Sequence, residues 1–419
     1  MRDEDRRFLI GLFDAAVHAA DPRLALAAHM PKPPKGRTIV IGAGKGSAQL
    51  AAAFEKLWQG PLEGVVVTRY GFGCPTTKIK VLEASHPVPD EAGLRASHAL
   101  FDAVKNLTED DLVVALISGG GSALLPMPAE GLSLQDEMDL NKALLASGAP
   151  ISVMNAIRKQ ISNIKGGRLA LACHPSPVVS LIVSDIPGDE AADVASGPTV
   201  PSAVSRKDAR ALVEAWRIHL PPRIAEFLKS NANLPPSPDD PRFAKHEVRI
   251  IASACQSLEA AAKYAEAAGI PSVIFSDSIE GEARDVGAVH AALVREIATR
   301  DRPFTKPVVI LSGGETTVTL KGKGRGGRNG EFLLSLAIAA DGMNFSALAA
   351  DTDGIDGSED NAGAFATGET ASRLRASGQN PRGLLAANDS YSAFEALGDL
   401  FVPGPTGTNV NDFRAILLR

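Results

Sequence analysis

The sequence contains few cysteines and few aromatic residues, and it has no long hydrophobic run. Its 419 residues include three cysteines, Cys74, Cys173 and Cys255, which stand far apart. An odd number of widely spaced cysteines provides neither a disulfide framework nor the spacing of zinc ligands. We therefore expect the protein to work in a reducing environment, the cytoplasm. Aromatic residues make up 5% of the chain, too few for the base-stacking surfaces of single-stranded nucleic-acid binders. No apolar run approaches the ~18 residues that a membrane span needs.

An excess of positive charge is also lacking. Lys and Arg together number 43 and Asp and Glu 49, so the net charge is −6. This balance disfavours nucleic acid and anionic membranes as partners. Three acids precede Phe8, unlike the start of a secretory signal. What the chain does have is glycine, 39 residues of it, much of it in short clusters. Such clusters are typical of backbone that approaches a ligand closely.

Short runs rich in Val and Ile alternate with longer segments of helical periodicity. This alternation predicts an α/β fold with largely parallel sheets. The expected strands include 38–41, 112–117, 178–183, 248–252, 307–311, 316–320 and 345–350. The strongest domain boundary is the segment 234–241, whose four prolines exclude both a helix and a central strand. We therefore predict two α/β domains, residues 1–236 and residues 237–419.

The first glycine cluster follows the first expected strand. Gly42, Gly44 and Gly46 would let backbone N–H groups reach a phosphate at the start of the following helix. Lys45 within the turn favours an ammonium directed at a transferring phosphoryl group. The turn is one residue short of a dinucleotide fingerprint, but Arg69 at the end of the next strand would suit a 2′-phosphate, so NADP binding stays open. The plain alternative is a tight turn with a solvated lysine.

Two further segments of the first half carry candidate groups. Ser118 to Ser122 contain Gly119, Gly120 and Gly121 directly after a buried strand, which predicts an anion-binding nest at the strand's carboxyl end. Asp185 and Asp189 follow another strand, where they are placed to hold Mg²⁺ or to accept a proton. An ordinary Pro-Gly turn is the competing interpretation for the two aspartates.

The second half repeats the pattern with added positive charge. Gly313, Gly314 and Glu315 follow an apolar strand, and a glycine-rich segment with Arg325 and Arg328 comes next. We predict a mobile cationic loop whose guanidinium groups recognise phosphate or carboxylate. An exposed basic hairpin loop is the alternative.

Two polar segments near the end of the chain complete the set. Asp351 and Asp353 stand at the end of a strand, in a segment that resembles a Ca²⁺ loop except that Ala362 occupies the position of its bidentate acid. We therefore interpret these acids as ligand or Mg²⁺ contacts, and an acidic solvated turn is the alternative. Asn409 lies in a turn-rich loop before the last strand, and a plain surface loop is the alternative for that segment.

Taken together, these segments resemble the glycerate 2-kinase family, whose C-terminal part is the MOFRL domain. The residues that carry the resemblance are Gly42-Ala-Gly-Lys-Gly46, Ser118-Gly-Gly-Gly-Ser-Ala-Leu124, Ser184-Asp-Ile-Pro-Gly-Asp189, Ser196-Gly-Pro-Thr199, Ser312-Gly-Gly-Glu-Thr316, Gly324-Arg-Gly-Gly-Arg-Asn329, Thr352-Asp-Gly-Ile-Asp-Gly357 and Gly404-Pro-Thr-Gly-Thr-Asn409. The resemblance implies a Rossmann-like N-terminal domain, a smaller MOFRL-type domain and an active-site cleft between them. It also implies phosphorylation of D-glycerate at its 2-hydroxyl, dependent on ATP and Mg²⁺.

From the motifs and this resemblance we assign expected roles. The expected catalytic residues are Lys45, Arg328 and Asp189, and Mg²⁺ is expected at Asp189 and Asp353. The substrate D-glycerate is expected at Ser118, Gly119, Gly120, Gly121 and Ser122. The nucleotide is expected at Gly42, Gly44, Gly313, Gly314, Glu315, Arg325, Asp351 and Asn409.

Two other functions stay open at this point. Family members have also been labelled hydroxypyruvate reductases, and an NAD(P)H-dependent reductase would use the first turn and Arg69 while leaving the arginine loop idle. A non-enzymatic sugar-phosphate-binding protein would use the nests alone, although no DNA-binding element is evident. A small-molecule substrate is the expected partner, and a homodimer stays open.

Overall fold

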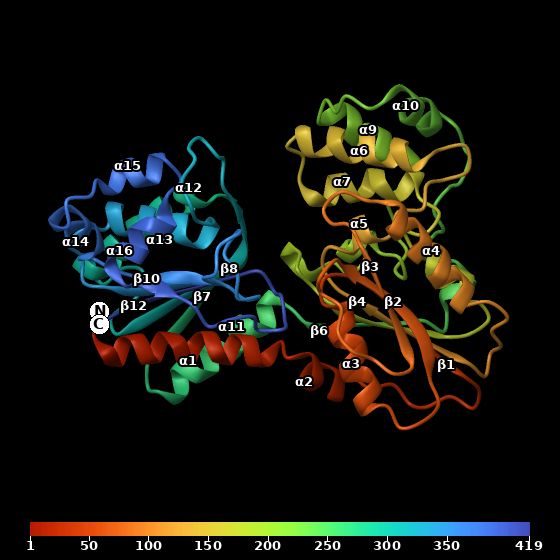
Figure 1. The fold of residues 1–419 in the computed structure, drawn as a ribbon, viewed down its shortest axis with the longest axis horizontal. Helices are drawn as coiled ribbons and strands as arrows, with labels where there is room; N and C mark the ends of the chain where they lie inside the picture. The colour runs from red at the N-terminus through yellow and green to blue at the C-terminus, as the bar shows by residue number, and fades with distance from the viewer. The chain divides into compact units, whose positions relative to one another are not determined.

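The computed structural model describes residues 1–419, apart from the side chain of Pro187. The chain forms two compact units (Figure 1). We call Pro22–Ser184 with Asp189–Ile251 the N-terminal unit, and Met1–Asp21, Asp185–Gly188 and Ala252–Arg419 the C-terminal unit. Among the described residues, no helix is both long enough and apolar enough to span a membrane.

The N-terminal unit is built on a six-stranded sheet of order β3-β2-β1-β4-β5-β6. The β1–β2, β1–β4, β2–β3 and β4–β5 pairs are all parallel, as the sequence predicted. Both β1 and β4 are buried throughout, which explains their unbroken apolar runs. The strands are β1 Thr38–Ala43, β2 Glu63–Arg69, β3 Ile79–Ala84, β4 Leu112–Ile117, β5 Val178–Val183 and β6 Glu247–Ala252.

This strand order contains a switch point between β1 and β4. The chain runs outward from β1 to β3 in one direction and from β4 to β5 in the other. In open α/β sheets, ligands bind outside the carboxyl ends of the strands at such a point. The two glycine clusters that follow β1 and β4 therefore lie where the fold favours a binding site.

Several helices of the N-terminal unit begin at residues whose side chains cap them. The Asp90 side chain accepts from the Gly93 N–H at the start of α4, and Ser133 with Asp136 forms a capping box at α6. Helices α6, α7, α9 and α10 bury a hydrophobic cluster of their own (Figure 1). The helices are α2 Pro22–Ala27, α3 Ser47–Leu57, α4 Glu91–Ala103, α5 Gly121–Leu124, α6 Leu134–Ala146, α7 Ile151–Arg158, α8 Arg168–Ala172, α9 Arg206–Ala215 and α10 Pro222–Lys229.

The C-terminal unit contains a second six-stranded sheet, of order β11-β10-β9-β12-β8-β7. Here the prediction of a largely parallel sheet is wrong in detail, because only the β7–β8 pair is parallel. Strands β7, β8 and β9 do share one direction, but β12 inserts between β8 and β9 antiparallel to both. The strands are β7 Ser272–Glu282, β8 Val308–Thr317, β9 Ser346–Asp351, β10 Gly363–Thr367, β11 Leu400–Phe401 and β12 Asp412–Leu418. The separate strand expected at 316–320 is wrong, because β8 includes its first two residues and ends at Thr317.

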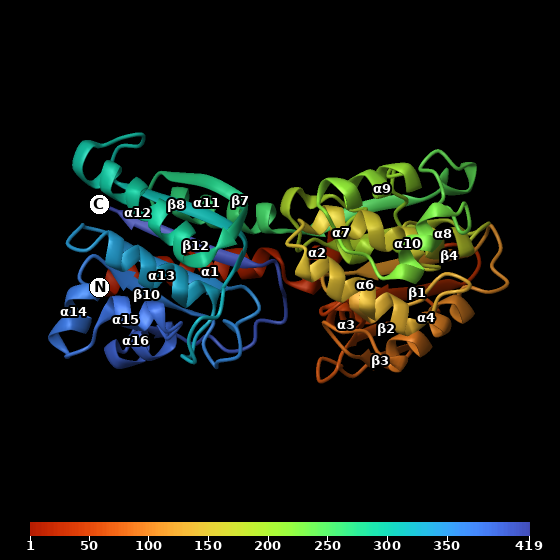
Figure 2. The same ribbon diagram turned by 90° about the horizontal axis from the view of Figure 1, so that it is seen from above.

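Helices cover both faces of this second sheet (Figure 2). Alternate residues of β8, β9 and β12 face α1 and α11 on one side and α12 and α13 on the other, so two hydrophobic cores result. The helices are α1 Asp3–Ala19, α11 Ala254–Ala267, α12 Ala283–Arg300, α13 Arg328–Ala339, α14 Thr370–Ala376, α15 Pro381–Ala386 and α16 Ser390–Leu397.

The two compact units differ from the division at 236/237. Helix α1 packs on the second sheet, where Asp5 pairs with Arg419 at 2.9 Å. Strand β6 follows the proline-rich segment but joins the first sheet. The prolines therefore lie in a connection within the N-terminal unit, between α10 and β6. They interrupt secondary structure there as expected, without dividing the units.

Candidate functional site

The two glycine clusters of the N-terminal unit form one structure at the switch point. The Lys45 backbone N–H donates to the Gly119 carbonyl at 2.8 Å. The Gly46 N–H donates to the Ser118 hydroxyl oxygen at 3.0 Å. These bonds fix the turn after β1 against the turn after β4. The sequence predicted each turn separately, and the structure brings them together.

Glycine is required at two positions of this double turn. Gly44 has a φ of 137°, and a Cβ there would lie 2.2 Å from the Ser118 hydroxyl oxygen. Gly120 has a φ of 77°, and a Cβ there would lie 3.0 Å from Lys45 Cγ and 3.1 Å from His86 Nε2. The space beside Gly120 is therefore bordered by a lysine and a histidine. Bare backbone in this position can approach a ligand closely.

His86 borders the turn as a neutral side chain. Burial lowers its pKa to about 4, with further contributions from the positive charges of Lys45 and Arg69. At neutral pH the imidazole therefore adds no charge to the site.

The Ser196-Gly-Pro motif supports the second glycine turn. The hydroxyl oxygens of Ser122 and Ser196 are 2.7 Å apart, and the Ser196 hydroxyl donates to Asn155 Oδ1 at 3.0 Å. Ala195, Ser196 and Gly197 all have positive φ values, of 53°, 60° and 58°. Left-handed conformation at non-glycine residues is costly and clusters at functional sites.

Asp189 lies in the same region of the chain. It has a φ of 52° and a half-buried side chain, directly after Gly188 with a φ of 78°. The sequence predicted a carboxylate in a turn after β5, and the turn is confirmed. Its role stays a prediction.

The second cluster lies at one edge of the sheet in the C-terminal unit. Strand register places Asp412, at the start of β12, opposite both Gly314 of β8 and Asp351 of β9. Arg328, the first residue of α13, extends to this edge. Its Nε lies 2.5 Å from Asp412 Oδ1 and its Nη2 lies 2.6 Å from Asp351 Oδ2. Its Nη1 is 3.8 Å from Glu315 Oε1.

Asp412 is the centre of this cluster and was not among the predicted site residues. Besides Arg328, its carboxylate accepts from Asn329 Nδ2 at 2.9 Å and from the N–H and hydroxyl of Thr316, both at 3.2 Å. Arg414 Nη2 donates to the same carboxylate at 2.5 Å. Asp412 therefore joins α13, β8 and β12 at one point.

Arg414 was likewise not among the site residues predicted from the sequence. Its side chain is 0% exposed and its guanidinium lies 5.0 Å from the centre of the Phe332 ring. It donates to the Gly313 carbonyl at 3.3 Å and to the Thr316 hydroxyl at 3.1 Å. Arg414 thus connects the predicted Gly313–Gly314 segment to the buried acid of β12.

The ionisation of this cluster follows from burial and close charges. Burial alone would lower the pKa of Arg328, but Asp412, Asp351 and Glu315 raise that pKa above its ordinary value. The pKa of Asp351 is raised, first by burial and then by the neighbouring acids Asp353 and Asp412, although Arg328 acts against the rise. Burial also acts to raise the pKa of Asp412, but Arg328 and Arg414 outweigh it and lower that pKa. A permanently charged arginine is thus held between two carboxylates.

A second buried acid fixes the start of α13. The Asp356 carboxylate accepts from the backbone N–H groups of Asn329 at 3.0 Å and Gly330 at 2.8 Å. It thereby satisfies donors at the helix N-terminus, where a negative charge is favoured. Burial nonetheless raises its pKa to about 6. Nearby, the Asp353 N–H donates to Asp351 Oδ1 at 3.0 Å, so the two predicted acids are adjacent.

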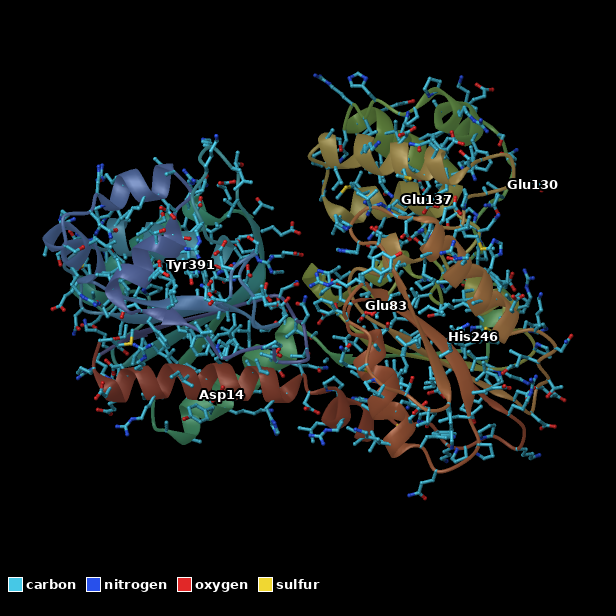
Figure 3. All side chains as sticks on the ribbon, viewed as in Figure 1. Asp14, Glu83, Glu130, Glu137, His246 and Tyr391 are labelled. Atoms are coloured by element: carbon cyan, nitrogen blue, oxygen red, sulfur yellow. The ribbon has the colours of Figure 1, made fainter. Side chains whose placement is uncertain are left out.

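The glycine-rich loop before α13, which the sequence predicted to be mobile, is anchored by hydrogen bonds in this structure. The Gly322 N–H donates to Asn388 Oδ1 and the Arg325 N–H donates to Asp389 Oδ1, both at 3.0 Å. The Arg325 guanidinium pairs with Glu359 at 2.9 Å and lies 4.0 Å from the ring centre of Tyr391, which Figure 3 labels. The cause is the α15–α16 connection, which the sequence did not place beside this loop.

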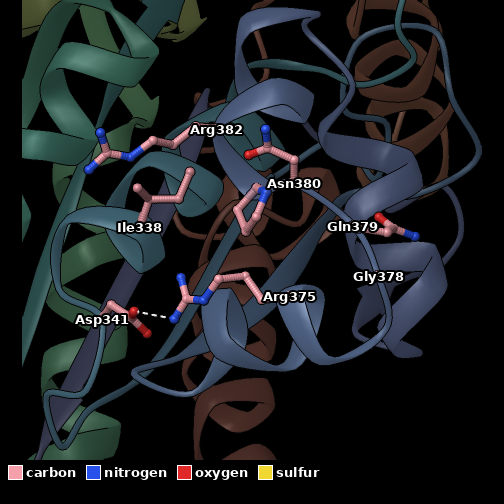
Figure 4. A pocket seen from close by; sticks show the side chains of 8 residues that line it. Ile338, Asp341, Arg375, Gly378, Gln379, Asn380 and Arg382 are labelled. Carbon is pink, nitrogen blue, oxygen red and sulfur yellow. Dashed lines mark hydrogen bonds and ion pairs between the residues drawn. The ribbon is translucent and has the colours of Figure 1, made fainter.

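The predicted nucleotide contact Asn409 forms a local hydrogen bond. Asn409 Oδ1 accepts from the Asn411 N–H at 3.0 Å. Among the residues that the structure describes, no group of three or more His, Cys, Asp or Glu side chains is arranged to hold a metal ion. One surface cavity of about 470 Å³ in the C-terminal unit is lined by Arg375, Gln379 and Arg382, with Asp341 paired to Arg375 (Figure 4). None of the predicted site residues lines it.

These two clusters define a class of protein: an α/β enzyme whose glycine turns, lysine and fixed arginine suit anionic substrates. Two family models match the chain. The MOFRL family model covers residues 308–412, and a model described as a domain of unknown function, DUF4147, covers residues 8–229. The chain belongs to the glycerate 2-kinase family with a C-terminal MOFRL domain.

Individual relatives agree with this family. The D-glycerate 2-kinase of Thermotoga maritima is 38% identical, with 97% of each chain covered. A protein of Agrobacterium vitis that bears the provisional name hydroxypyruvate reductase is 49% identical, covering 99% of this chain and 94% of its own. The crystal structure of the Thermotoga maritima glycerate kinase matches with a TM-score of 0.89 at 36% identity, covering 100% of both chains. The predicted family and α/β fold class are thereby confirmed.

Proposed function

We propose that this protein is a glycerate 2-kinase that transfers the γ-phosphoryl group of ATP to the 2-hydroxyl of D-glycerate. The observation that carries the proposal is Arg328, held by Asp412 and Asp351 at 2.5 and 2.6 Å. In phosphoryl transfer, the protein mainly positions the reactants and neutralises charge on the transferring group. An arginine fixed before the substrates arrive needs little reorganisation during the reaction.

We assign the charge-stabilising roles to Lys45 and Arg328. The Lys45 ammonium extends from a turn whose backbone is fixed by Gly119 and Ser118. Arg328 keeps its guanidinium charged because carboxylates surround it. Both charges are proposed to contact the transferring phosphoryl group, where negative charge is redistributed in the transition state. Stabilisation there lowers the barrier to the reaction rather than only tightening binding.

Asp189 is the proposed general base. It would accept the proton of the 2-hydroxyl as that oxygen bonds to phosphorus and ADP leaves. The left-handed backbone at Asp189, with a φ of 52°, supports a functional role because such strain is retained at active sites.

Asp189 and Asp353 are the residues proposed to hold Mg²⁺. When bound, Mg²⁺ would neutralise phosphate charge and orient the transferring group. Mg²⁺ takes one or two protein carboxylates and completes its shell with water and substrate phosphates, and each of these two residues offers one carboxylate. Asp353 is half-buried and one of its oxygens, Oδ1, accepts from the Ile355 N–H at 2.8 Å. That bond orients the carboxylate.

The remaining predicted residues are proposed to bind the substrates. Ser118 to Ser122 would receive the carboxylate of D-glycerate, because Gly120 leaves backbone exposed beside Lys45. The nucleotide contacts proposed from the sequence are Gly42, Gly44, Gly313, Gly314, Glu315, Arg325, Asp351 and Asn409. For Arg325 this contact competes with Glu359 and Tyr391, which already engage its guanidinium.

One assay pair tests the proposal against a reductase. Purified protein is given D-glycerate with Mg-ATP, or hydroxypyruvate with NADH or NADPH, and ADP formation and nucleotide absorbance are followed separately. We expect ADP formation only in the presence of D-glycerate and no oxidation of NAD(P)H. Lys45→Ala should abolish turnover, whereas the matched control Lys56→Ala, an exposed lysine on α3, should retain it. Hydroxypyruvate-dependent oxidation of NAD(P)H without ADP formation would overturn the kinase proposal.

A further inference from the structure

A second cavity lies in the N-terminal unit, and none of the site residues assigned above lines it. It has a volume of about 500 Å³ and lies beside α7 and the short 3-10 helix η1, Lys159–Ile161. This size falls within the ~300–1,000 Å³ typical of small-molecule sites. Most of its wall is apolar and includes Val153, Ala156, Ala192, Val204 and Leu212. An apolar wall of this kind favours a ligand with a hydrocarbon body.

Lys159 supplies a buried positive charge to this cavity. Its side chain is 2% exposed, and its Nζ pairs with Asp193 Oδ1 at 2.6 Å. An ammonium carries three N–H donors, and this is the one acceptor that the described side chains and backbone provide for it. Buried donors without acceptors cost free energy. An anionic ligand in the cavity would satisfy the remaining donors.

We propose that this cavity binds a small organic monocarboxylic acid, with its carboxylate on Lys159 and its hydrocarbon body against the apolar wall. Glu190 and Asp193 also line the cavity, and their negative charges disfavour a phosphate dianion more than a ligand with a single negative charge. The polar substrate glycerate lacks the hydrocarbon body that the wall favours. The residues that line the cavity do not include those of the glycine turn at Ser118.

The cavity is connected to the glycine turn by hydrogen bonds. The Asp193 carbonyl accepts from Asn155 Nδ2 at 3.0 Å. Asn155 Oδ1 accepts from Ser196, whose hydroxyl lies 2.7 Å from that of Ser122. A carboxylate that competes with Asp193 for Lys159 would act on the strained segment that supports the turn. Regulation of the turn rests on the proposed kinase function, whereas binding to the cavity does not.

Binding is tested by titration calorimetry of the full chain without nucleotide. Hexanoate is the probe, hexanamide is its neutral match and inorganic phosphate is the second control. We expect one hexanoate per chain, with hexanamide and phosphate at least about tenfold weaker, because charge-assisted hydrogen bonds exceed neutral ones. D-Glycerate at the same concentration should not displace hexanoate.

Two variants locate the binding. Lys159→Met should weaken hexanoate at least about tenfold and remove its advantage over hexanamide, whereas Lys142→Met, an exposed lysine on α6, should change nothing. Should Lys159→Met fail to fold by circular dichroism, Ser152→Trp serves in its place, since this exposed residue lines the cavity and a large ring there should block it.

Four results would overturn the proposal that this cavity binds a monocarboxylic acid. They are no hexanoate binding, equal binding of hexanamide, unchanged binding in Ser152→Trp, and displacement of hexanoate by D-glycerate. Because nucleotide is absent, none of these results depends on whether the protein is a kinase. If binding holds, an effect of hexanoate on ADP formation would then test the connection to the turn.

Discussion

Replacing Asp412 by asparagine should destabilise the C-terminal unit strongly. The Asp412 carboxylate is 0% exposed and balances two guanidinium groups, Arg328 and the fully buried Arg414, each at 2.5 Å. Asparagine has nearly the same shape but no charge, so Asp412→Asn leaves Arg414 without its carboxylate partner. Breaking a buried ion pair by removing one partner typically costs about 3–5 kcal/mol. We expect a loss of that size in the free energy of unfolding.

Removing the positively charged partner instead should lower the free energy of unfolding by less. Arg414→Met leaves Asp412 paired with Arg328, so the cluster keeps one acid with one base at its centre. We expect a loss of roughly 1–3 kcal/mol, the cost of buried polar groups left without partners. The control is Asp341→Asn, whose partner Arg375 is 54% exposed while Asp341 is 33% exposed. Such an exposed pair should contribute about 0–1 kcal/mol.

The assay is urea unfolding followed by hydrogen exchange in peptides from β8 and β12. Exchange is read from these peptides because two compact units do not have to unfold together. The reasoning would be refuted if Asp412→Asn lowered the free energy of unfolding by no more than the Asp341→Asn control does. It would show that Asp412 does not balance buried positive charge in this cluster.

Three further outcomes are expected. Gly120→Val should remove activity, because the added Cβ would lie 3.0 Å from Lys45 Cγ in a backbone conformation with a φ of 77°; wild-type kinetics in the folded variant would exclude this turn as the substrate site. Lys45→Ala and Arg328→Ala should each lower kcat by on the order of 10³ or more. Arg325→Ala should be milder because the Arg325 side chain is 53% exposed, against 23% for Arg328, so water screens its charge more. Equal losses in steady-state assays would contradict this ranking. The pKa of Asp356 is about 6 in the folded protein, against an ordinary value of 3.8, so the neutral form of this side chain favours the fold. The free energy of unfolding, compared with that of Asp356→Asn, should fall by roughly 3 kcal/mol as the pH rises from about 4 to about 6. A difference between the two proteins that does not change with pH in urea unfolding would contradict this prediction.

The sequence was most informative where a local pattern has one physical cause. Glycines directly after the buried runs 112–117 and 38–41 required close backbone approach, and both turns are confirmed at the ends of β4 and β1. Arg328 stood before a helical segment, where a guanidinium has few structural uses, and it does begin α13. In these cases the residue type and its immediate neighbours determine the geometry.

What the sequence could not provide depends on partners distant in the chain. Asp412 and Arg414 alternate with apolar residues in the last strand, a pattern that is also found in ordinary strands with one solvated face. Only the insertion of β12 between β8 and β9 places Asp412 opposite Gly314 and Asp351. The loop containing Arg325 appeared mobile because its anchors, Asn388 and Asp389, are more than sixty residues away.

The position of α1 has a consequence for biosynthesis. Along the chain, α1 comes before every strand of the sheet on which it packs, and the central strand β12 is the last of those strands to be synthesised. At ~5–20 residues per second, the interval between the two is on the order of 20–80 s. Throughout it the nascent chain exposes the apolar side chains Phe8, Leu9, Leu12 and Phe13, which are buried in the finished fold. The packing of α1 on its complete sheet can therefore form only after β12 has been synthesised.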